Sequence, residues 1–324
     1  MRGIRVHQFG DPSVLKLEEM PVPEPGPGQV QVRLQAAGVN PVDTYIRSGR
    51  YGSLPALPFT PGSDGAGLIS AVGSGVTQWK AGDRVFFFGT AQGRAYGAYA
   101  DYAVCDAARV YHLPAAVSFA QGAALGVPFA TAHQALFGRA QAQAGDIVFV
   151  HGASGGVGIA ALQLARWKGL KVIGTAGTAE GLELVKANGA HFAVSHRAAL
   201  YLDQIRDATQ GKGPDIILEM LANVNLDQDL TLIARRGRVV IIGNRGRIEI
   251  DPRQIMSKDS NVLGMMLWNA TDDELDQIYH DLIKGLEAGV LVPVVGFEFP
   301  LAEASKAHDR VMMQGAYGKV VLVS

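Results

Sequence analysis

This chain of 324 residues has a single cysteine, nearly balanced positive and negative charges, and no long apolar run. Its single cysteine, Cys105, excludes an intramolecular disulfide and a cysteine-rich zinc site, and it fits a reducing compartment. Lysine and arginine number 29 against 30 aspartates and glutamates, a balance that disfavours a nucleic-acid-binding protein. No run reaches ~18 apolar residues and the first residues lack a signal-peptide core, so we expect a cytoplasmic protein without a transmembrane helix.

Glycine is the residue in excess, at 40 positions, and it separates the elements of two different patterns along the chain. Residues 29–36 alternate polar and apolar side chains, which is the period of a half-buried antiparallel strand. Further short apolar runs separated by turn residues predict a small β-barrel or sandwich in this first part of the chain. These runs are 67–72, 84–88, 99–104 and 110–113.

The pattern changes near residue 119, beyond which apolar runs and helical segments alternate. Such alternation predicts a parallel sheet with helices on both faces, and six runs match the strand number of a dinucleotide-binding Rossmann sheet. The sequence therefore predicts an α/β protein, with a strand-like run at 318–323 that returns to the first domain. The six runs are 147–151, 171–175, 191–195, 215–219, 238–242 and 262–267, and the helices are 157–168, 179–188, 198–209, 225–234 and 272–288, the last one capped by Thr271 and Glu274.

The strongest chemical signal is the sequence GASGGVG at 152–158, between the first of these runs and a helix. Ala153, Gly155 and Gly158 take the three places of the motif G-x-G-x-x-G. A glycine at 155 lets the backbone approach a pyrophosphate, and one at 158 lets the helix pack closely on the strand. The free N–H groups at the helix N-terminus would hold the phosphates, so the motif predicts a dinucleotide.

The same residues also satisfy G-x-S-x-G, the nucleophile elbow of α/β-hydrolases, in which Ser154 would be the nucleophile. A hydrolase would need a loop histidine after the last strands. The late histidines, His280 and His308, both lie in helical patterns, which disfavours this alternative.

The segment after the second run of the sheet bears on the choice between NAD and NADP. An NAD enzyme usually places an acidic residue there, about 20 residues past the glycines, to bind the ribose hydroxyls. The sequence TAGT at 175–178 carries no acid, so a 2′-phosphate would not be repelled. His196, Arg197 and Lys171 are the nearest candidates to contact that phosphate, and we expect NADPH rather than NADH.

The segment GASGGVGIAALQLAR at 152–166 resembles the signature of the zeta-crystallin-type quinone oxidoreductases, a zinc-free branch of the medium-chain dehydrogenase/reductases. The resemblance covers essentially the whole chain, with a small departure at Phe149, where the signature usually carries leucine. It implies a GroES-like β-barrel catalytic domain over 1–121, completed by 268–324, and a Rossmann domain over 122–267. Other similar segments are GVNPVDTYIRSGRY (38–51), PGSDGAG (61–67), ILEMLANVNLDQDL (217–230), IIGNRG (241–246) and GKVVL (318–322).

The resemblance also bears on metal binding. Zinc-dependent members of the superfamily hold a catalytic metal through a cysteine in the first motif and a His–Glu pair in the second. The corresponding places here hold Asn40 and Ser63-Asp64, and none of the eight histidines forms a recognised zinc-ligand spacing. We therefore predict no metal, and a site suited to electron-poor acceptors that need no strong polarisation.

The site residues follow from the resemblance one at a time. Tyr45 matches a tyrosine beside the nicotinamide, and Tyr45, Asn40 and Tyr51 would orient a quinone. Ordinary packing remains the alternative for the two tyrosines, as core filling does for the methionines among the cofactor residues. The matching cofactor contacts are Ser154, Gly155, Gly156 and Val157 at the pyrophosphate, Gly177 and His196 at the adenosine, and Asn225, Ile242, Gly243, Asn244, Arg245, Met265, Met266 and Leu267 towards the nicotinamide.

We therefore expect zinc-independent reduction of a small-molecule quinone by NADPH, in one-electron or two-electron steps. Two alternatives stay open: an NADPH-dependent alkenal or enone reductase on the same scaffold, and a binding role, as an AU-rich RNA binder or a structural crystallin. The sixth apolar run, 262–267, is expected at the sheet edge, where related proteins pair two sheets. A homodimer or homotetramer is therefore predicted.

Overall fold

The computed structural model describes residues 1–93, 97–315 and 317–324, which form two compact units. The first unit comprises Met1–Val127, Tyr279–Met313 and Gly318–Ser324, and the second comprises Pro128–Ile278 and Gln314–Tyr317. The chain passes from the first unit to the second inside helix α3 (Gly126–His133), and it returns to the first unit inside helix α9 (Asp272–Glu287). These changes of unit follow Val127 and Ile278, which lie 6 and 11 residues beyond the expected limits at 121 and 267.

Strand β3 (Gln29–Val39) is the central element of the first unit. The predicted alternation is confirmed, since Val30, Val32 and Leu34 are at most 2% exposed, and the strand continues three residues beyond the predicted range. The sheet has the order β14-β15-β3-β4-β5-β7, with β6 also paired to β3, and all pairs are antiparallel except β14 with β15. Its strands are β4 (Asp64–Val72), β5 (Arg84–Phe88), β6 (Tyr102–Asp106), β7 (Val110–His112), β14 (Val295–Pro300) and β15 (Lys319–Val323).

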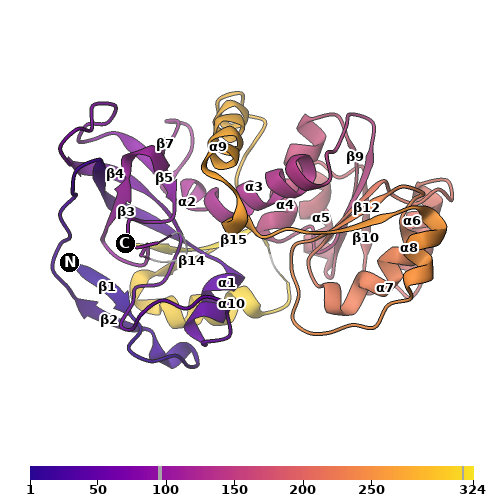
Figure 1. Cartoon of the computed structure of the whole chain (residues 1–324), viewed down its shortest axis with the longest axis horizontal. Coiled ribbons are helices and arrows are strands. Elements are labelled where there is room, and N and C mark those ends of the chain that lie inside the picture. The colour runs from indigo at the N-terminus through magenta and orange to yellow at the C-terminus, as the bar shows by residue number, and fades with distance from the viewer. Residues whose placement is uncertain (94–96, 316) are drawn as a thin grey trace. The chain divides into compact units, whose positions relative to one another are not determined.

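Smaller elements complete the first unit (Figure 1). The predicted run at 318–323 does return to this unit, as strand β15 between β14 and β3. A separate two-stranded sheet and three α-helices accompany the main sheet: β1 (Arg2–Arg5), β2 (Lys16–Glu19), α1 (Pro41–Arg47), α2 (Phe119–Gly122) and α10 (Ala304–Met312), with 3-10 turns at Pro12–Val14, Ala107–Arg109 and Leu301–Glu303.

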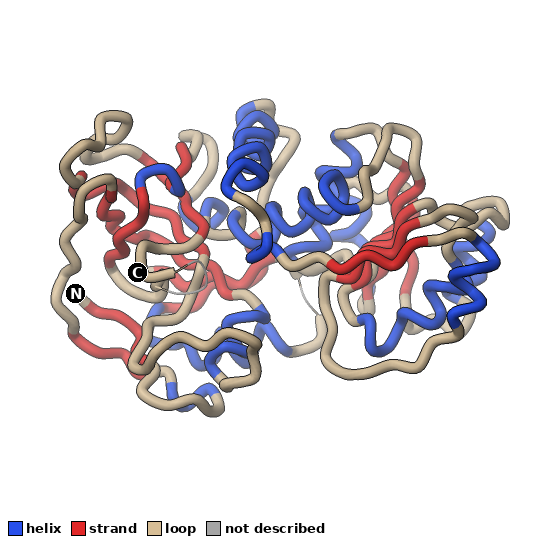
Figure 2. The backbone as a smooth tube through the Cα atoms, in the orientation of Figure 1, coloured by secondary structure: helices blue, strands red, loops and turns tan. Residues whose placement is uncertain are grey.

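The second unit contains the predicted six-stranded parallel sheet, in the order β10-β9-β8-β11-β12-β13. Figure 2 shows helices on both faces of it, α4 and α5 on one and α6, α7 and α8 on the other. The strands are β8 (Ile147–Val150), β9 (Lys171–Ala176), β10 (Phe192–Ser195), β11 (Ile216–Glu219), β12 (Arg238–Ile241) and β13 (Asn261–Gly264). The helices are α4 (Gly156–Trp167), α5 (Ala179–Ala187), α6 (Tyr201–Ala208), α7 (Ala222–Leu232) and α8 (Pro252–Lys258).

Three predicted bounds in this unit are wrong by three residues. Helix α6 begins at Tyr201 instead of residue 198. The sixth strand ends at Gly264 instead of Leu267, because the N–H of Met265 still bonds to Ile241 but Leu267 begins a 3-10 turn (Leu267–Asn269). Helix α7 begins at Ala222 instead of residue 225, because the carboxylate of Glu219 accepts from the N–H of Leu221 and turns the chain at once. The loop between β11 and α7 is therefore shorter than predicted, whereas the segments before α6 and after β13 are longer.

Between the two patterns of strands, the chain forms α2, α3 and a π-helical turn (Gln134–Arg139). The predicted cap of α9 is confirmed, since Thr271 N donates to Glu274 Oε2 at 2.8 Å and Glu274 N to Thr271 Oγ1 at 3.2 Å. Among the described residues, no helix is both long enough and apolar enough to cross a membrane.

Candidate functional site

The glycine loop joins β8 to α4 in the second unit. Gly152 has a φ of +56°, in the left-handed region that favours glycine. Gly155 is the N-cap of α4, so Gly156 and Val157 carry the first unpaired N–H groups of a 12-residue helix. A Cβ on Gly158 would lie 2.5 Å from a Cα of the loop, so a larger residue would push the helix away. The loop thus presents the N–H donors and the positive helix end that a pyrophosphate binds.

Ser154 lies within this loop and is 8% exposed. The histidines that a hydrolase would need are in helices, as predicted: His280 is in α9 and His308 is in α10. His308 is buried in the first unit, where its Nε2 lies 3.2 Å from the hydroxyl of Tyr99. Burial lowers the pKa of His308 to about 3, so this imidazole is neutral and already bonded. The geometry gives the hydrolase alternative no support.

Two basic side chains surround Gly177, which directly follows β9. A Cβ on Gly177 would lie 2.8 Å from His196 Nε2 and 3.2 Å from Arg197 Nε. The guanidinium of Arg197 is held by Gln314, whose Oε1 accepts from Nη2 at 3.0 Å. Partial burial lowers the pKa of His196, and the neighbouring His151 and Arg197 lower it further. The end of β9 therefore offers one fixed positive charge and one imidazole to an anion.

The predicted contacts after β11 and β12 lie against one another. Ile242 N and Gly243 N both donate to the carbonyl of Glu219, at 2.9 and 3.2 Å. A Cβ on Gly243 would lie 2.2 Å from Met220 O, so this crossing requires glycine. The amide of Asn225 donates to Glu219 Oε1 at 3.1 Å, so it helps to hold this loop.

The remaining predicted cofactor residues differ in exposure. Asn244 and Arg245 are exposed, and Arg245 N donates to Asn223 Oδ1 at 2.9 Å. After β13, Met265 is half-buried, Met266 is 52% exposed and Leu267 is 5% exposed. Core filling thus accounts for Leu267 but not for Met266. The cofactor role of these residues stays a prediction.

A buried cluster that the sequence analysis missed lies at the carboxyl ends of β8 and β11. His151 Nε2 is 2.8 Å from Asp229 Oδ1, on α7, and 3.3 Å from Glu219 Oε2. Burial raises the pKa of Glu219 and of Asp229 to about 7 and lowers the pKa of His151. One ligand atom from each residue lies within 4.8 Å of the others, as a metal site requires. With a neutral imidazole the cluster would carry two negative charges, which protons or a divalent cation could neutralise. Burial disfavours the ionised form of both carboxyl groups, which is why their pKa values are raised.

The buried carboxyl groups make the stability of the second unit depend on pH. Because their folded pKa values, about 7, exceed the ordinary values of 3.8 and 4.5, the folded state keeps protons that the unfolded chain releases. Their contribution to the free energy of unfolding is therefore complete below pH 4 and is lost as the pH rises through about 7. We expect Asp229→Asn, which keeps an acceptor oxygen for His151, to flatten this fall by up to about 1.4 kcal/mol per pH unit.

Urea unfolding of Asp229→Asn at several values between pH 5 and 8 measures this slope. The matched control is Asp227→Asn, on the same helix and outside the cluster, which should retain the slope of the unchanged chain. Equal slopes in all three proteins would contradict a protonated buried pair.

A second buried polar group lies in the first unit, around the predicted acceptor residue Asn40. Asn40 is the N-cap of α1 and is 3% exposed. Its Nδ2 donates to Asp64 Oδ2 at 2.8 Å, and its Oδ1 accepts from the ammonium of Lys319. Lys319 Nζ also lies 3.0 Å from Asp64 Oδ2, so the three side chains form a closed ring. Breaking a buried ion pair by removing one partner typically costs about 3–5 kcal/mol, so each charge depends on the other.

The start of α1 carries a further buried carboxyl group. Asp43 Oδ2 accepts from Asn40 N at 2.8 Å and from the hydroxyl of Tyr99 at 2.9 Å. Burial raises the pKa of Asp43 to about 7 although Lys319 opposes the shift, and burial also raises the pKa of Tyr99. These bonds fix the first turn of α1, and Tyr45 lies further along the same helix.

The two predicted tyrosines have different surroundings. Tyr45 is half-buried on α1, where its carbonyl accepts from Arg50 N at 2.9 Å. Tyr51 is half-buried and packs against the hydrophobic core of the first unit, which favours the packing alternative for this residue. Asn40 is thus the N-cap of the helix that carries Tyr45, and the catalytic roles of both residues stay predictions.

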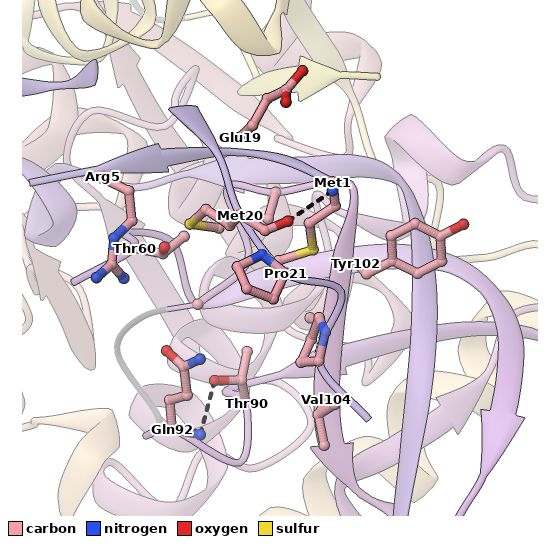
Figure 3. A pocket seen from close by; sticks show the side chains of 14 residues that line it. Met1, Arg5, Glu19, Met20, Pro21, Thr60, Thr90, Gln92, Tyr102 and Val104 are labelled. Atoms are coloured by element: carbon pink, nitrogen blue, oxygen red, sulfur yellow. Dashed lines mark hydrogen bonds between the residues drawn. The ribbon is translucent and has the colours of Figure 1, made fainter. Parts of the chain in front are cut away.

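Figure 3 shows a cavity of about 290 Å³ in the first unit. Its lining includes Met1 and Met20, and Met1 N donates to Met20 O at 2.8 Å across it. Asn40, Tyr45 and Lys319 do not line it. This cavity is therefore separate from the candidate acceptor residues.

Sequence reasoning did not single out four of the buried polar residues described above as candidate site residues. They are Lys319, His151, Glu219 and Asp229. The available signal was position, since His151 and Glu219 come where parallel strands end and Lys319 begins a strand. A charged or titratable residue buried at a strand end is rarely unpaired and often functional. Their partners could not be assigned from spacing, because they come from distant parts of the chain.

Comparison with known families agrees with this two-part arrangement. A family model described as an alcohol dehydrogenase GroES-like domain matches residues 26–115, and one described as a zinc-binding dehydrogenase matches residues 156–285. A crystal structure of an NAD-dependent alcohol dehydrogenase covers 100% of both chains with a TM-score of 0.93 and 30% identity. The fold and these matches define the class, a two-domain medium-chain dehydrogenase/reductase.

Closer similarity is found among curated proteins. Quinone oxidoreductases of Rattus norvegicus and Homo sapiens are 50% and 49% identical over 325 residues, covering 100% of this chain and 98% of each relative. The crystal structure of Escherichia coli quinone oxidoreductase complexed with NADPH covers 100% of both chains with a TM-score of 0.87 and 31% identity. The chain belongs to the quinone oxidoreductase family, so the predicted resemblance, fold class and oxidoreductase class are confirmed.

The description of the second family model raises the question of zinc. The place where zinc-dependent relatives carry a cysteine and a His–Glu pair holds Asn40 and Asp64, both bound by the ammonium of Lys319. Zinc takes thiolate, imidazole and carboxylate ligands, and an amide is a poor substitute. A cation already neutralises the one carboxylate, so the residues at this place do not fit a zinc ion.

Proposed function

We propose that this protein reduces quinones with NADPH and without zinc. The observation that carries the proposal is the ring of Lys319, Asn40 and Asp64, in which an ammonium group binds two of the residues that correspond, by the resemblance, to zinc ligands. A fixed monovalent cation cannot ionise an alcohol as a metal does, but an easily reduced acceptor needs no such activation. The names of the two curated relatives, both quinone oxidoreductases, support the same acceptor class.

The second unit has the groups that NADPH needs. The N–H groups of Gly156 and Val157 would bind the pyrophosphate, and Arg197 with His196 would bind the 2′-phosphate beside Gly177. Glu180 is exposed and lies in the first turn of α5, beyond the position of the usual ribose-binding acid. The NADPH complex of the Escherichia coli relative supports this cofactor.

The residues of this chain have mainly positioning roles in such a reaction. Bound NADPH supplies a hydride, which is two electrons and a proton. The loops after β8, β11 and β12 would hold the cofactor, and Tyr45 and Asn40 would orient the acceptor from α1. Orientation of two bound reactants converts a bimolecular step into a unimolecular one, which is a large part of the barrier reduction available here.

Steady-state oxidation of NADPH, with 9,10-phenanthrenequinone and with an enone as alternative acceptors, tests the proposal directly. We expect the higher kcat/KM with the quinone, unchanged activity after treatment with a chelator, and much less than one zinc per chain by elemental analysis. Faster reduction of the enone would replace the proposed substrate class. Stoichiometric zinc whose removal abolishes activity would contradict the zinc-free mechanism.

Arg197 should determine the preference for NADPH. Hydrogen bonds to a charged group typically contribute about 1.5–3 kcal/mol, so Arg197→Ala should raise KM for NADPH roughly 10-fold to 100-fold. KM for NADH should stay within about two-fold, because NADH lacks the 2′-phosphate. Arg206→Ala, which removes an exposed arginine on α6, is the matched control. An equal rise of KM for both cofactors would show that Arg197 has another role.

We also propose a homo-oligomer that associates through β13, the edge strand of the six-stranded sheet. Val262 and Leu263 are half-buried there and Met266, just beyond the strand, is 52% exposed, a combination that favours pairing with a second sheet. Light scattering after size-exclusion chromatography should give a mass of at least twice 34.3 kDa, and a monomer would contradict this assembly. A cytoplasmic location stays a prediction.

A further inference from the structure

The ring of Lys319, Asn40 and Asp64 is assembled from three separate elements. Asn40 precedes α1, Asp64 begins β4 and Lys319 begins β15. All three side chains are at most 4% exposed. The ring is closed on one carboxylate oxygen, because Asp64 Oδ2 accepts from both Asn40 Nδ2 and Lys319 Nζ. The other carboxylate oxygen of Asp64 accepts from Val127 N at 2.8 Å, at the start of α3, so the carboxylate has no freedom to rotate.

The chemistry of the donors fixes the orientation of the amide. Lys319 can only donate and the Asp64 carboxylate can only accept, so the oxygen of Asn40 faces the lysine and its nitrogen faces the aspartate. An ammonium has three N–H donors and an amide has two. Two donors of Lys319 and one of Asn40 are used in the ring. One N–H of each residue remains, and within the part of the chain that the structure describes neither meets a further acceptor.

Two glycines keep room for the side chains of this ring. A Cβ on Gly38 would lie 2.9 Å from Lys319 Cε and 2.2 Å from the carbonyl of Ala123. A Cβ on Gly126 would lie 2.2 Å from Asp64 Oδ1. Both glycines are therefore required by the ring, because any side chain there would displace the lysine or the carboxylate.

We propose that Lys319 and Asn40 are a donor pair for the acceptor oxygen that becomes negatively charged during reduction. This inference rests on the proposed function and assigns Lys319 as a further residue of the acceptor site. A quinone that takes two electrons and one proton as hydride from NADPH becomes a hydroquinone monoanion, and the oxidised product is NADP⁺. The monoanion then takes a second proton from water. Two preoriented N–H donors, one of them charged, stabilise that anion more than the neutral quinone.

The ion pair with Asp64 explains how a positive charge can be held ready in a buried place. Asp64 compensates the ammonium when no acceptor is bound, so the pair has no net charge. Asp64 Oδ2 accepts one N–H of Lys319 and one N–H of Asn40, and the carboxylate is held in place by Val127 N. The remaining N–H groups therefore stay oriented without substrate, as preorganised stabilisation requires.

The variant Lys319→Met tests the proposal by its effect on chemistry, with NADPH binding as a separate readout. Loss of one such donor typically costs about 100-fold in kcat, and we expect a loss of that size with the dissociation constant of NADPH within two-fold. Across substituted 1,4-benzoquinones, the loss should be greatest for the quinones of lowest reduction potential, whose reduction needs the most stabilisation. Lys306→Met, which removes an exposed lysine on α10, is the matched control and should behave like the unchanged chain.

The outcomes separate the donor pair from a merely structural role. If Lys319→Met does not fold, the double variant Lys319→Met/Asp64→Asn removes both charges and is measured in its place. An equal fractional loss for every quinone, or full activity, would overturn the proposal while leaving NADPH-dependent quinone reduction intact. If the unchanged chain itself does not reduce quinones with NADPH, the proposed function fails and the donor pair fails with it.

Discussion

A buried positive charge must be paired, and much of the first unit is organised around pairing one. The ammonium of Lys319 is 4% exposed, and its partner Asp64 is fully buried. Their pairing joins β15 to β4, and Asn40 adds the junction of β3 with α1. Two glycines keep the space open, and a backbone N–H of α3 holds the carboxylate. Because an unpaired charge in this place would be very unfavourable, these elements can take only the arrangement that closes the ring.

A different solution to the same problem is found in the second unit. Its buried carboxyl groups, Glu219 and Asp229, lie against the imidazole of His151, and burial raises the pKa of each to about 7. Protonation of these groups lowers the negative charge at the ends of two parallel strands. The neighbouring loops are those predicted to bind the dinucleotide, and a lower negative charge there suits an anionic ligand.

The sequence was sufficient for most of the fold. Six apolar runs separated by helices identify a parallel sheet, because a strand that is covered on both faces is apolar at nearly every position. The alternation at 29–36 identified the central strand of the first unit for the opposite reason, since one of its faces is polar. Bounds were wrong where a side chain turned the chain early, as Glu219 does before α7. That interaction depends on a rotamer and leaves no periodic trace.

The candidate site was predictable only where its chemistry is local. GASGGVG carries its own context, a strand before it and a helix after it, and so a candidate pyrophosphate loop could be predicted between β8 and α4. Lys319 and Asn40 are separated by 279 residues, and no spacing rule relates them. Asn40 could be named by resemblance, but its partners follow only from the pairing of β15 with β3.

Strand β15 lies between β14 and β3, so the sheet of the first unit is formed by segments from both ends of the chain. Topologically, the second unit is an insertion between these segments. Closing a flexible loop costs free energy that grows only with the logarithm of its length, about 0.6 kcal/mol for each doubling. The length of the inserted unit therefore has little influence on whether Lys319 reaches Asp64. A cofactor-binding module of another size could replace it while the acceptor-side ring keeps the same three residues and the same neighbours.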